Sequence, residues 1–146
     1  MTPERMKGLY DEHIAAENRC DVAAVMATFE DDCFIDNIPF DVRVEGKRRI
    51  ARAYTLLFSA FPDGSRTIEG HAAGDDALVG WGIWRGTLLG EYLGLPPTGR
   101  SIEVPFVTIM LYGARDLIRG ERVFYDSLTL CDQAGIPIDA VRAGAR

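Results

Sequence analysis

The first third of the chain carries apolar residues at helical spacing. Over residues 4–18 they recur every three or four positions, which predicts an amphipathic helix. We expect a second helix to begin after Asp21, because aspartate is a preferred N-cap, and to bury apolar side chains as far as Phe29. A third helix follows Gly46 and is expected to end before Pro62, because the residue preceding a proline avoids helical backbone.

The remaining pattern is that of short strands. Between the second and third helices we expect a strand at residues 33–37, broken by Pro39, and a hairpin-like stretch at 40–44. After residue 66 the period changes from helical to alternating, with turn residues between the apolar runs. The expected strands are 67–73, 77–88, 101–112 and 117–126, followed by a closing helix from Ser127 to about Gln133.

Three helices followed by a mostly antiparallel sheet predict an α+β fold. A curved sheet of this kind can wrap around helices as an open cone. A chain of 146 residues has the size of one domain and can bury a real core or enclose a cavity. We therefore expect a single domain over residues 1–146, with three N-terminal helices, the curved sheet and a short C-terminal helix.

Two of the expected strands are apolar on both faces. Alternation puts Trp81 and Ile83 on one face of their strand, and Val107 and Ile109 on one face of the next. An isolated domain with a one-sided sheet should have a polar outer face, so an apolar one indicates that something covers it. We expect a homodimer through this outer face.

Composition excludes several classes of partner and site. A net charge of -6 argues against nucleic acid and anionic membrane as partners, because both select for clustered lysine and arginine. Three widely spaced cysteines fit neither a disulfide framework nor a zinc site, and we expect a cytoplasmic protein with no metal. The charged N-terminus lacks the apolar core of a signal peptide, and no apolar run is long enough to cross a bilayer.

Asp126 is the first candidate for chemistry. It ends an apolar strand, and a buried carboxyl there would have a raised pKa, as a general acid or base at neutral pH requires. The alternative is that Asp126 caps the helix that follows it, in which case amide hydrogen bonds would lower its pKa. The sequence leaves both roles open, and they are compatible with each other.

A loop with a distinctive order of residues links the chain to a known family. The run Gly-Leu-Pro-Pro-Thr-Gly-Arg at 94–100 is preceded by Gly86 and Thr87 and followed two strands later by Tyr125 and Asp126. This arrangement resembles SnoaL-like polyketide cyclases of the NTF2-like superfamily. The resemblance spans about residues 10–136 and implies the NTF2-like (cystatin-like) cone. Fold alone does not set the reaction, because this superfamily holds several enzyme classes and non-catalytic binding domains.

The resemblance also implies roles for particular residues. Asp126 matches the strand-end aspartate that serves the cyclases as general acid and base, with no metal or other cofactor. The polar residue at the mouth of their first short strand falls at Asp36 or Asn37, of which Asn37 could donate a hydrogen bond to an enolate oxygen. His13 lies near the position where ketosteroid isomerases place a tyrosine donor; it could equally be a buried helix histidine bonded to a neighbour.

The cavity is expected to be apolar. Met110 and Tyr112 occupy the stretch in which the founding cyclases carry a histidine, so its lining differs from theirs. Tyr54 and Tyr112 could donate hydrogen bonds into it or be satisfied within the core. The full set of expected lining residues is Asp36, Phe29, Tyr54, Phe58, Trp84, Phe106, Met110, Tyr112 and Phe124.

These observations favour a cofactor-independent enzyme that acts on a small hydrophobic carbonyl compound. The expected reaction is an intramolecular aldol-type cyclisation or an isomerisation, with Asp126 moving the proton and Asn37 or His13 polarising the oxygen. One alternative is a non-catalytic ligand-binding or dimerisation domain. The other is an epoxide or ester hydrolase; the superfamily's epoxide hydrolases use two carboxylates around an arginine, and no such set is clear from the sequence. The substrate is not identifiable from the residues.

Overall fold

The computed structural model describes all 146 residues as one sheet of six strands with helices packed on one of its faces. The helices are α1 (Pro3–Asn18), α2 (Val22–Ala27), α3 (Lys47–Ala60), α4 (Ser127–Ala134) and α5 (Ile138–Ala145), with a short 3-10 turn, η1, at Ile38–Phe40. The strands are β1 (Phe29–Asn37), β2 (Val42–Glu45), β3 (Ser65–Ala73), β4 (Ala77–Thr87), β5 (Ser101–Tyr112) and β6 (Ile118–Tyr125).

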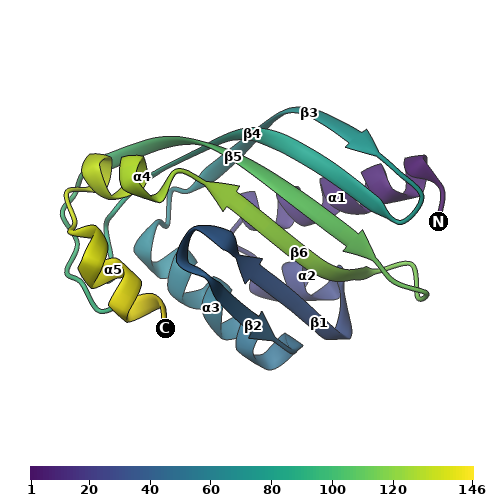
Figure 1. Ribbon diagram of the computed structural model, residues 1–146, viewed down its shortest axis with the longest axis horizontal. Coiled ribbons are helices and arrows are strands. Elements are labelled where there is room, and N and C mark those ends of the chain that lie inside the picture. Colours follow the sequence, from purple (N-terminus) through teal and green to yellow (C-terminus); the bar gives the residue numbers. More distant parts are fainter.

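The strands are arranged in the order β2-β1-β6-β5-β4-β3. All neighbouring pairs are antiparallel except β1 and β6, which run parallel. Figure 1 shows α1, α2 and α3 behind the sheet and α4 and α5 together at one end of it. The sheet therefore has one face covered by helices of its own chain and one face left open.

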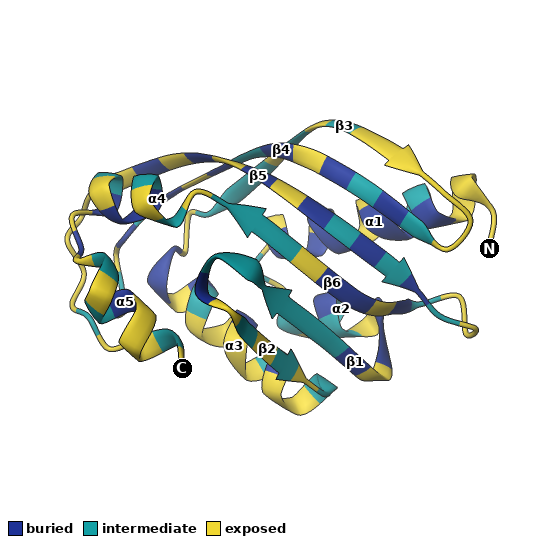
Figure 2. Cartoon of the chain, viewed as in Figure 1, coloured by how far each residue is buried: buried dark blue, intermediate teal, exposed yellow.

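Burial alternates along the central strands. On β5 the even-numbered residues are buried beneath the helices, and most of the odd-numbered ones are exposed on the outer face. Figure 2 shows this as bands of different burial along β4 and β5. Trp81 and Val107 are 40% and 37% exposed on the outer face, while Ile83 and Ile109 beside them are half-buried. The predicted apolar outer face is thus present.

The element order agrees with the prediction, with two corrections. Phe29 does not end the second helix; it begins β1, which continues through Asp31 and Asp32, because Thr28 ends α2 and pairs by its carbonyl with Ile118 of β6. The single C-terminal helix that was expected, α4, is followed by a second one, α5, in which Val141 is buried. The N-cap role predicted for Asp21 is confirmed by its side chain, which accepts a hydrogen bond from the Ala24 amide.

Candidate functional site

A cavity of about 540 Å³ lies between the covered face of the sheet and the helices. Its lining comes from α1, α3, β1, β2 and the central strands, and from Leu93, Gly94, Gly144 and Ala145 in a loop and in α5. Most of the lining is apolar, as is usual in sites for small molecules. The polar exceptions are few, so each of them is a candidate for chemistry.

Three charged side chains meet at one wall of this cavity. Glu17 comes from the last turn of α1, Arg66 from the start of β3 and Glu121 from β6. Arg66 Nε lies 2.7 Å from Glu17 Oε2, and both side chains are almost fully buried. Strand alternation turns Glu121 inward together with Val123 and Tyr125.

His13 lies directly behind these carboxylates, one helical turn before Glu17 and fully buried. Its Nδ1 is 2.9 Å from Thr28 Oγ1, and the Thr28 hydroxyl donates its only proton to the Val25 carbonyl at 2.6 Å. Thr28 can therefore only accept from His13, which fixes Nδ1 as a donor. Nε2 faces Glu17 Oε1 at 3.4 Å and Glu121 Oε2 at 3.9 Å.

The surroundings shift the pKa values of Glu17 and Glu121 in opposite directions. Burial acts to raise the pKa of Glu17, but Arg66 and His13 outweigh it and lower the pKa to about 2. Burial raises the pKa of Glu121 to about 7, and the neighbouring Glu17 charge acts in the same direction. Burial acts to lower the pKa of His13, but Glu17 and then Glu121 outweigh it and raise it. Near neutral pH the cluster thus combines a fixed ion pair with one carboxyl that can gain or lose a proton.

Two further polar side chains are oriented toward the cavity. The Tyr54 hydroxyl donates to Glu121 Oε2 at 3.3 Å, and burial raises the pKa of Tyr54 so that this proton is retained. On β1, Asn37 accepts a hydrogen bond from the Tyr125 hydroxyl through Oδ1 at 3.1 Å. That bond holds the amide so that its Nδ2 hydrogens are available to a ligand.

Several predicted site residues lie at the cavity. Asn37, the predicted hydrogen-bond donor, lines it together with Tyr54, Trp84 and Phe106 from the predicted lining set. His13 does not line it but contacts Glu121 and Tyr54, which do. The alternative left open for His13, a buried helix histidine bonded to its neighbours, is therefore also satisfied by this geometry.

Other predicted lining residues lie elsewhere. Phe29, Phe58, Met110 and Tyr112 belong to the core that packs beneath the cavity, and the Tyr112 hydroxyl donates to the Met6 carbonyl. Phe124 lies on the opposite face of β6, where Arg122 is above its ring, and Asp36 lies on the opposite face of β1, paired with Arg43 at 2.6 Å. The predictions for Phe124 and Asp36 were wrong because each residue lies on the outer face of its strand. Side chains alternate between the two faces, so the cavity is lined by their neighbours in the sequence instead.

Asp126 does not reach the cavity. It is exposed and caps α4, accepting hydrogen bonds from the Leu128 and Thr129 amides and from the Thr129 hydroxyl at 2.7 Å. The Thr129 hydroxyl and amide lower the pKa of Asp126. The expectation of a buried carboxyl with a raised pKa is wrong for this residue, and the helix-cap alternative is confirmed. The hydrogen bonds determine the direction of this pKa shift, because an exposed carboxyl loses little hydration that would raise its pKa.

The sequence argument missed Glu121 and Arg66. Alternation contained part of the signal: within 121–126 it groups Glu121 with Tyr125 and separates both from Asp126. It could not say which group faces inward. Nor could it bring Arg66 beside Glu17, because that contact depends on where the end of α1 meets β3.

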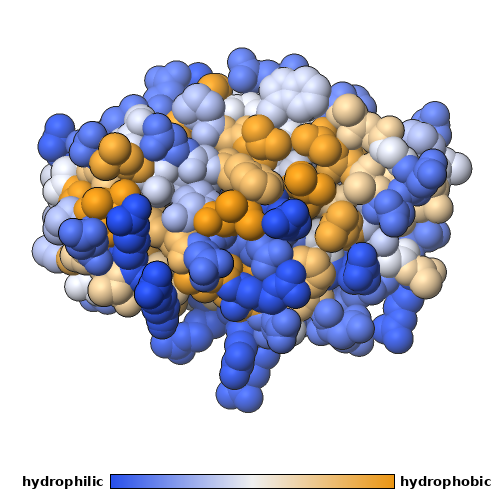
Figure 3. All heavy atoms as spheres, viewed as in Figure 1, coloured by the Kyte–Doolittle hydropathy of each residue, from blue (hydrophilic) through white to orange (hydrophobic).

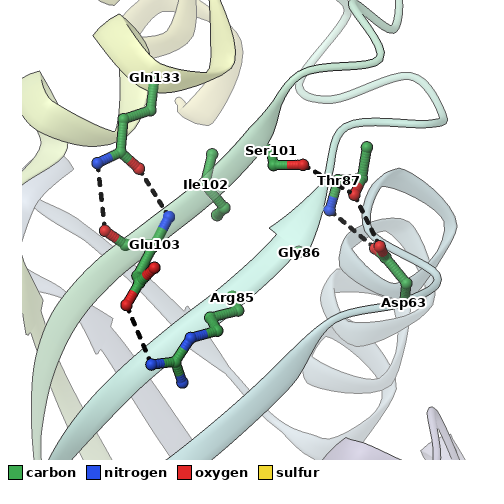
Figure 4. Close-up of a pocket in the computed structure, with 8 residues that line it drawn as sticks. All are labelled: Asp63, Arg85, Gly86, Thr87, Ser101, Ile102, Glu103 and Gln133. Carbon is green, nitrogen blue, oxygen red and sulfur yellow. Dashed lines mark hydrogen bonds and ion pairs between the residues drawn. The ribbon is translucent and has the colours of Figure 1, made fainter.

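No group of three or more histidine, cysteine, aspartate or glutamate side chains is arranged to hold a metal ion. A second hollow, of about 440 Å³, lies at the end of the sheet near α4 (Figure 4). Its polar groups satisfy one another: Gln133 bonds the Glu103 backbone, Glu103 pairs with Arg85 at 3.0 Å, and Asp63 accepts from Thr87. Because its polar groups are already paired, this hollow offers few hydrogen bonds to a ligand. The Gln133 contacts instead hold α4 against β5.

Comparison with known proteins identifies the family. The family model for SnoaL-like polyketide cyclase matches residues 4–134. The chain belongs to the SnoaL-like polyketide cyclase family. The resemblance predicted from the 94–100 loop is therefore confirmed, while no match was found among curated proteins.

Solved structures agree with this assignment. A candidate SnoaL-like polyketide cyclase from Jannaschia sp. CCS1 is 20% identical, with 94% of this chain and 97% of that chain aligned at a TM-score of 0.83. AclR, a candidate hydroxylase from Streptomyces galilaeus, is 22% identical over 94% and 100% of the two chains at 0.79. A protein with a ketosteroid isomerase-like fold from Catenulispora acidiphila, in complex with trimethylamine, is 19% identical over 95% and 98% at 0.77.

These likenesses confirm the predicted NTF2-like α+β fold of this family member. At such identities they do not carry a reaction, and the neighbours are themselves described by different reactions. The site must therefore be argued from its own residues. None of the helices is both long and apolar enough to span a membrane.

Proposed function

We propose that this SnoaL-like protein is a cyclase- or isomerase-type enzyme that moves a proton on a small hydrophobic carbonyl compound, with Glu121 as the general base and acid. The observation that carries the proposal is a carboxyl of pKa about 7 at the wall of an apolar cavity. A group with a pKa near the working pH exists in both protonation states and can take a proton and return it. Asp126 lacks this property, because it is exposed and its pKa is lowered.

Asn37 is the proposed donor to the carbonyl oxygen. Ile35 pairs with Glu121 and Asn37 pairs with Val123, so Asn37 is two residues farther along the sheet than Glu121 on the same face. That offset corresponds to about 7 Å. A carbonyl group with its adjacent C–H can bridge this gap, its oxygen on Asn37 Nδ2 and its acidic hydrogen toward Glu121. An enolate formed there would keep the hydrogen bond as its charge develops.

Tyr54 and His13 act in this proposal as positioning residues. The Tyr54 hydroxyl donates to one oxygen of Glu121, and His13 Nε2 faces one oxygen of each glutamate, at 3.4 Å from Glu17 and 3.9 Å from Glu121. His13 is itself held by Thr28, so the carboxyl has supports from α1 and α3. Such supports favour one rotamer of a catalytic side chain.

Deuterium exchange tests the proposal without knowledge of the natural substrate. In D₂O, the protein should accelerate exchange of the α-hydrogens of a hydrophobic ketone such as 1-tetralone, followed by NMR. Glu121→Gln should reduce the acceleration about 10²- to 10⁴-fold, because it removes the transferring group. Asp126→Asn, directly after the same strand, is the matched control and should leave the exchange rate unchanged.

The outcomes separate the alternatives. Binding of the ketone without exchange would favour the non-catalytic ligand-binding domain. Full exchange in Glu121→Gln would refute the assigned role, and a loss confined to Asp126→Asn would restore the role first expected for that residue.

Hydrolysis of an epoxide or ester remains a second candidate because of one observation. Glu17, Arg66 and Glu121 provide two carboxylates and an arginine at one wall, a set that was not apparent from the sequence. With Glu121 ionised, such a set could activate a water molecule. Reaction of an epoxide or ester probe in ¹⁸O-labelled water tests this candidate, because hydrolysis would place the label in the diol or carboxylic acid that is formed.

We also propose that a second copy of the chain covers the outer face of the sheet. Figure 3 shows hydrophobic side chains gathered on this face and bordered by hydrophilic ones. Arg85 and Glu103 beside the apolar residues already pair with each other at 3.0 Å, so covering this face leaves neither of their charges unpaired. Sedimentation at micromolar concentration should give a dimer, and Val107→Lys should give a monomer. A monomeric wild-type protein would contradict the proposal.

A further inference from the structure

Arg66 has hydrogen-bonding capacity that the protein does not use. Its Nε is paired with Glu17, while Nη1 and Nη2 form no hydrogen bond within the protein. No buried side-chain nitrogen or oxygen lacks a partner, so these two nitrogens must border open space. Arg66 lines the cavity, and its side chain is only 12% exposed.

The position of this guanidinium is fixed from several directions. The Asn18 side chain accepts a hydrogen bond from the Arg66 backbone amide at 2.8 Å and donates one to the Arg66 carbonyl at 3.0 Å. Glu17, the preceding residue of α1, holds Nε, and the Trp84 ring lies beneath the guanidinium carbon at 5.6 Å. An arginine held in this way loses little side-chain entropy when it binds a ligand.

The local charge also favours an anion. When Glu121 is protonated and His13 is charged, Glu17 offsets only one of the two cations in the cluster. The remaining acidic lining residue, Glu91, is exposed rather than enclosed. One net positive charge then faces a cavity that is otherwise mostly apolar, and its attraction for an anion is weakly screened there.

We propose that the Nη1–Nη2 edge of Arg66 binds the carboxylate of an apolar ligand whose ring or chain lies along Trp84 and the hydrophobic lining. Two parallel N–H donors match the two oxygens of a carboxylate, which a single ammonium cannot do. The inference rests on the proposed function in taking this cavity as the substrate site, and it names the substrate class as hydrophobic carboxylic acids.

Calorimetric titration with two probes of the same shape tests this site. Biphenyl-4-carboxylate carries the charge, and biphenyl-4-carboxamide is its neutral counterpart. The wild-type protein should bind the carboxylate about 10- to 100-fold more tightly, as expected for charge-assisted hydrogen bonds. Arg66→Met should bind both probes within about twofold of each other. Arg48→Met, which removes an exposed arginine from the first turn of α3, should keep the wild-type preference.

A second variant covers the case in which Arg66→Met fails to fold because Glu17 is left unpaired. The double variant Glu17→Gln with Arg66→Met removes both members of the buried pair and should also lose the preference. A preference that persists in the folded double variant would overturn the proposal. Equal affinity of the wild-type protein for both probes, or binding of neither, would also overturn it.

Neither probe has a hydrogen α to a carbonyl, so this measurement is independent of the exchange assay. Loss of exchange activity in the wild-type protein with a retained carboxylate preference would refute proton transfer by Glu121 alone. Exchange without the preference would refute the Arg66 site alone.

Discussion

Glu121 and Asp126 are five residues apart, yet their surroundings shift the pKa values of the two carboxyl groups in opposite directions. Glu121 points under the sheet into a desolvated cluster, and its pKa is raised to about 7. Asp126 lies at the exposed end of the strand, where three hydrogen bonds to the first turn of α4 favour the charged form and lower its pKa. The contrast teaches that distance from water, rather than position in an apolar run, prepares a carboxyl for proton transfer.

The two regions also differ in what their polar contacts achieve. Around Glu121 the contacts are long, with a hydrogen bond from Tyr54 at 3.3 Å and the His13 ring nitrogen at 3.9 Å, and they join side chains from three elements. Around Asp126 they are short and local, and they define where a helix begins. The first region is arranged to change protonation, and the second to remain in one state.

The largest expected effect comes from removing the histidine of the interior region. His13→Leu leaves Glu17 and Glu121 with Arg66 as the only neighbouring cation, and breaking a buried ion pair in this way costs about 3–5 kcal/mol. Urea denaturation should show the loss as a lower midpoint. His71→Leu, at an exposed position of β3, is the matched control and should change the free energy of unfolding by less than about 0.5 kcal/mol. If His13→Leu lowered the free energy of unfolding by no more than His71→Leu does, the ion pairs of His13 would contribute no stability.

The two carboxyls should also give opposite dependences of stability on pH. The pKa of Glu121 rises on folding from 4.5 to about 7, so its contribution is present below pH 4.5 and is lost as pH rises through about 7. Glu121→Gln should therefore become more stable relative to the wild-type protein across that window. Thermal melting at a series of pH values measures this difference.

Asp126 provides the contrasting curve. Its pKa is lowered on folding from 3.8, so its contribution is present above pH 3.8 and is lost as pH falls through the lower folded value. Asp126→Asn should be less stable than the wild-type protein near neutral pH and should converge with it in acid. Parallel curves for the two variants would show that the regions do not differ as described.

A smaller effect is expected from the hydroxyl that bonds Glu121. Tyr54→Phe removes a hydrogen bond to the ionised carboxyl and should raise the pKa of Glu121 further. If Glu121 acts as the base, the acidic limb of kcat/KM for ketone exchange should move up by about one pH unit. Tyr112→Phe is the control, because its hydroxyl bonds the Met6 carbonyl rather than the cluster. A limb that stays in place in Tyr54→Phe would place the titrating group elsewhere.

The sequence predicted the fold far better than the site, for a physical reason. Period and turn residues are local properties, so they located α1, α3 and the four strands β3 to β6, and the 94–100 loop indicated the family. A catalytic wall is made by contacts between distant segments. Glu17 lies one turn after His13 on the same helix face, but Arg66 joins them only through the meeting of α1 with β3.

The errors on β6 have a single cause. Asp126 and Phe124 share one face of the strand, and both were placed inward; Glu121 lies on the other face and was not considered. Alternation gives the two faces but leaves their assignment open when both are partly apolar. The burial of Glu121 is not apparent from the sequence, because the charged side chains that surround it come from other elements.

The smallest effect is expected at the strand end. Thr129→Val removes the hydroxyl that bonds Asp126 at 2.7 Å, but both amide bonds to the carboxylate remain, so α4 should still begin at Ser127. The melting temperature should fall by a few degrees at most, and less than in Asp126→Ala, which loses the whole cap. Neither change should alter ketone exchange, because the cavity lining includes no residue of α4. If Thr129→Val lowered exchange while melting stayed unchanged, the cap would be coupled to the cavity through Tyr125, which both precedes Asp126 and orients Asn37. In that case the Glu121 cluster and the Asp126 cap would act as one coupled site rather than as two independent regions.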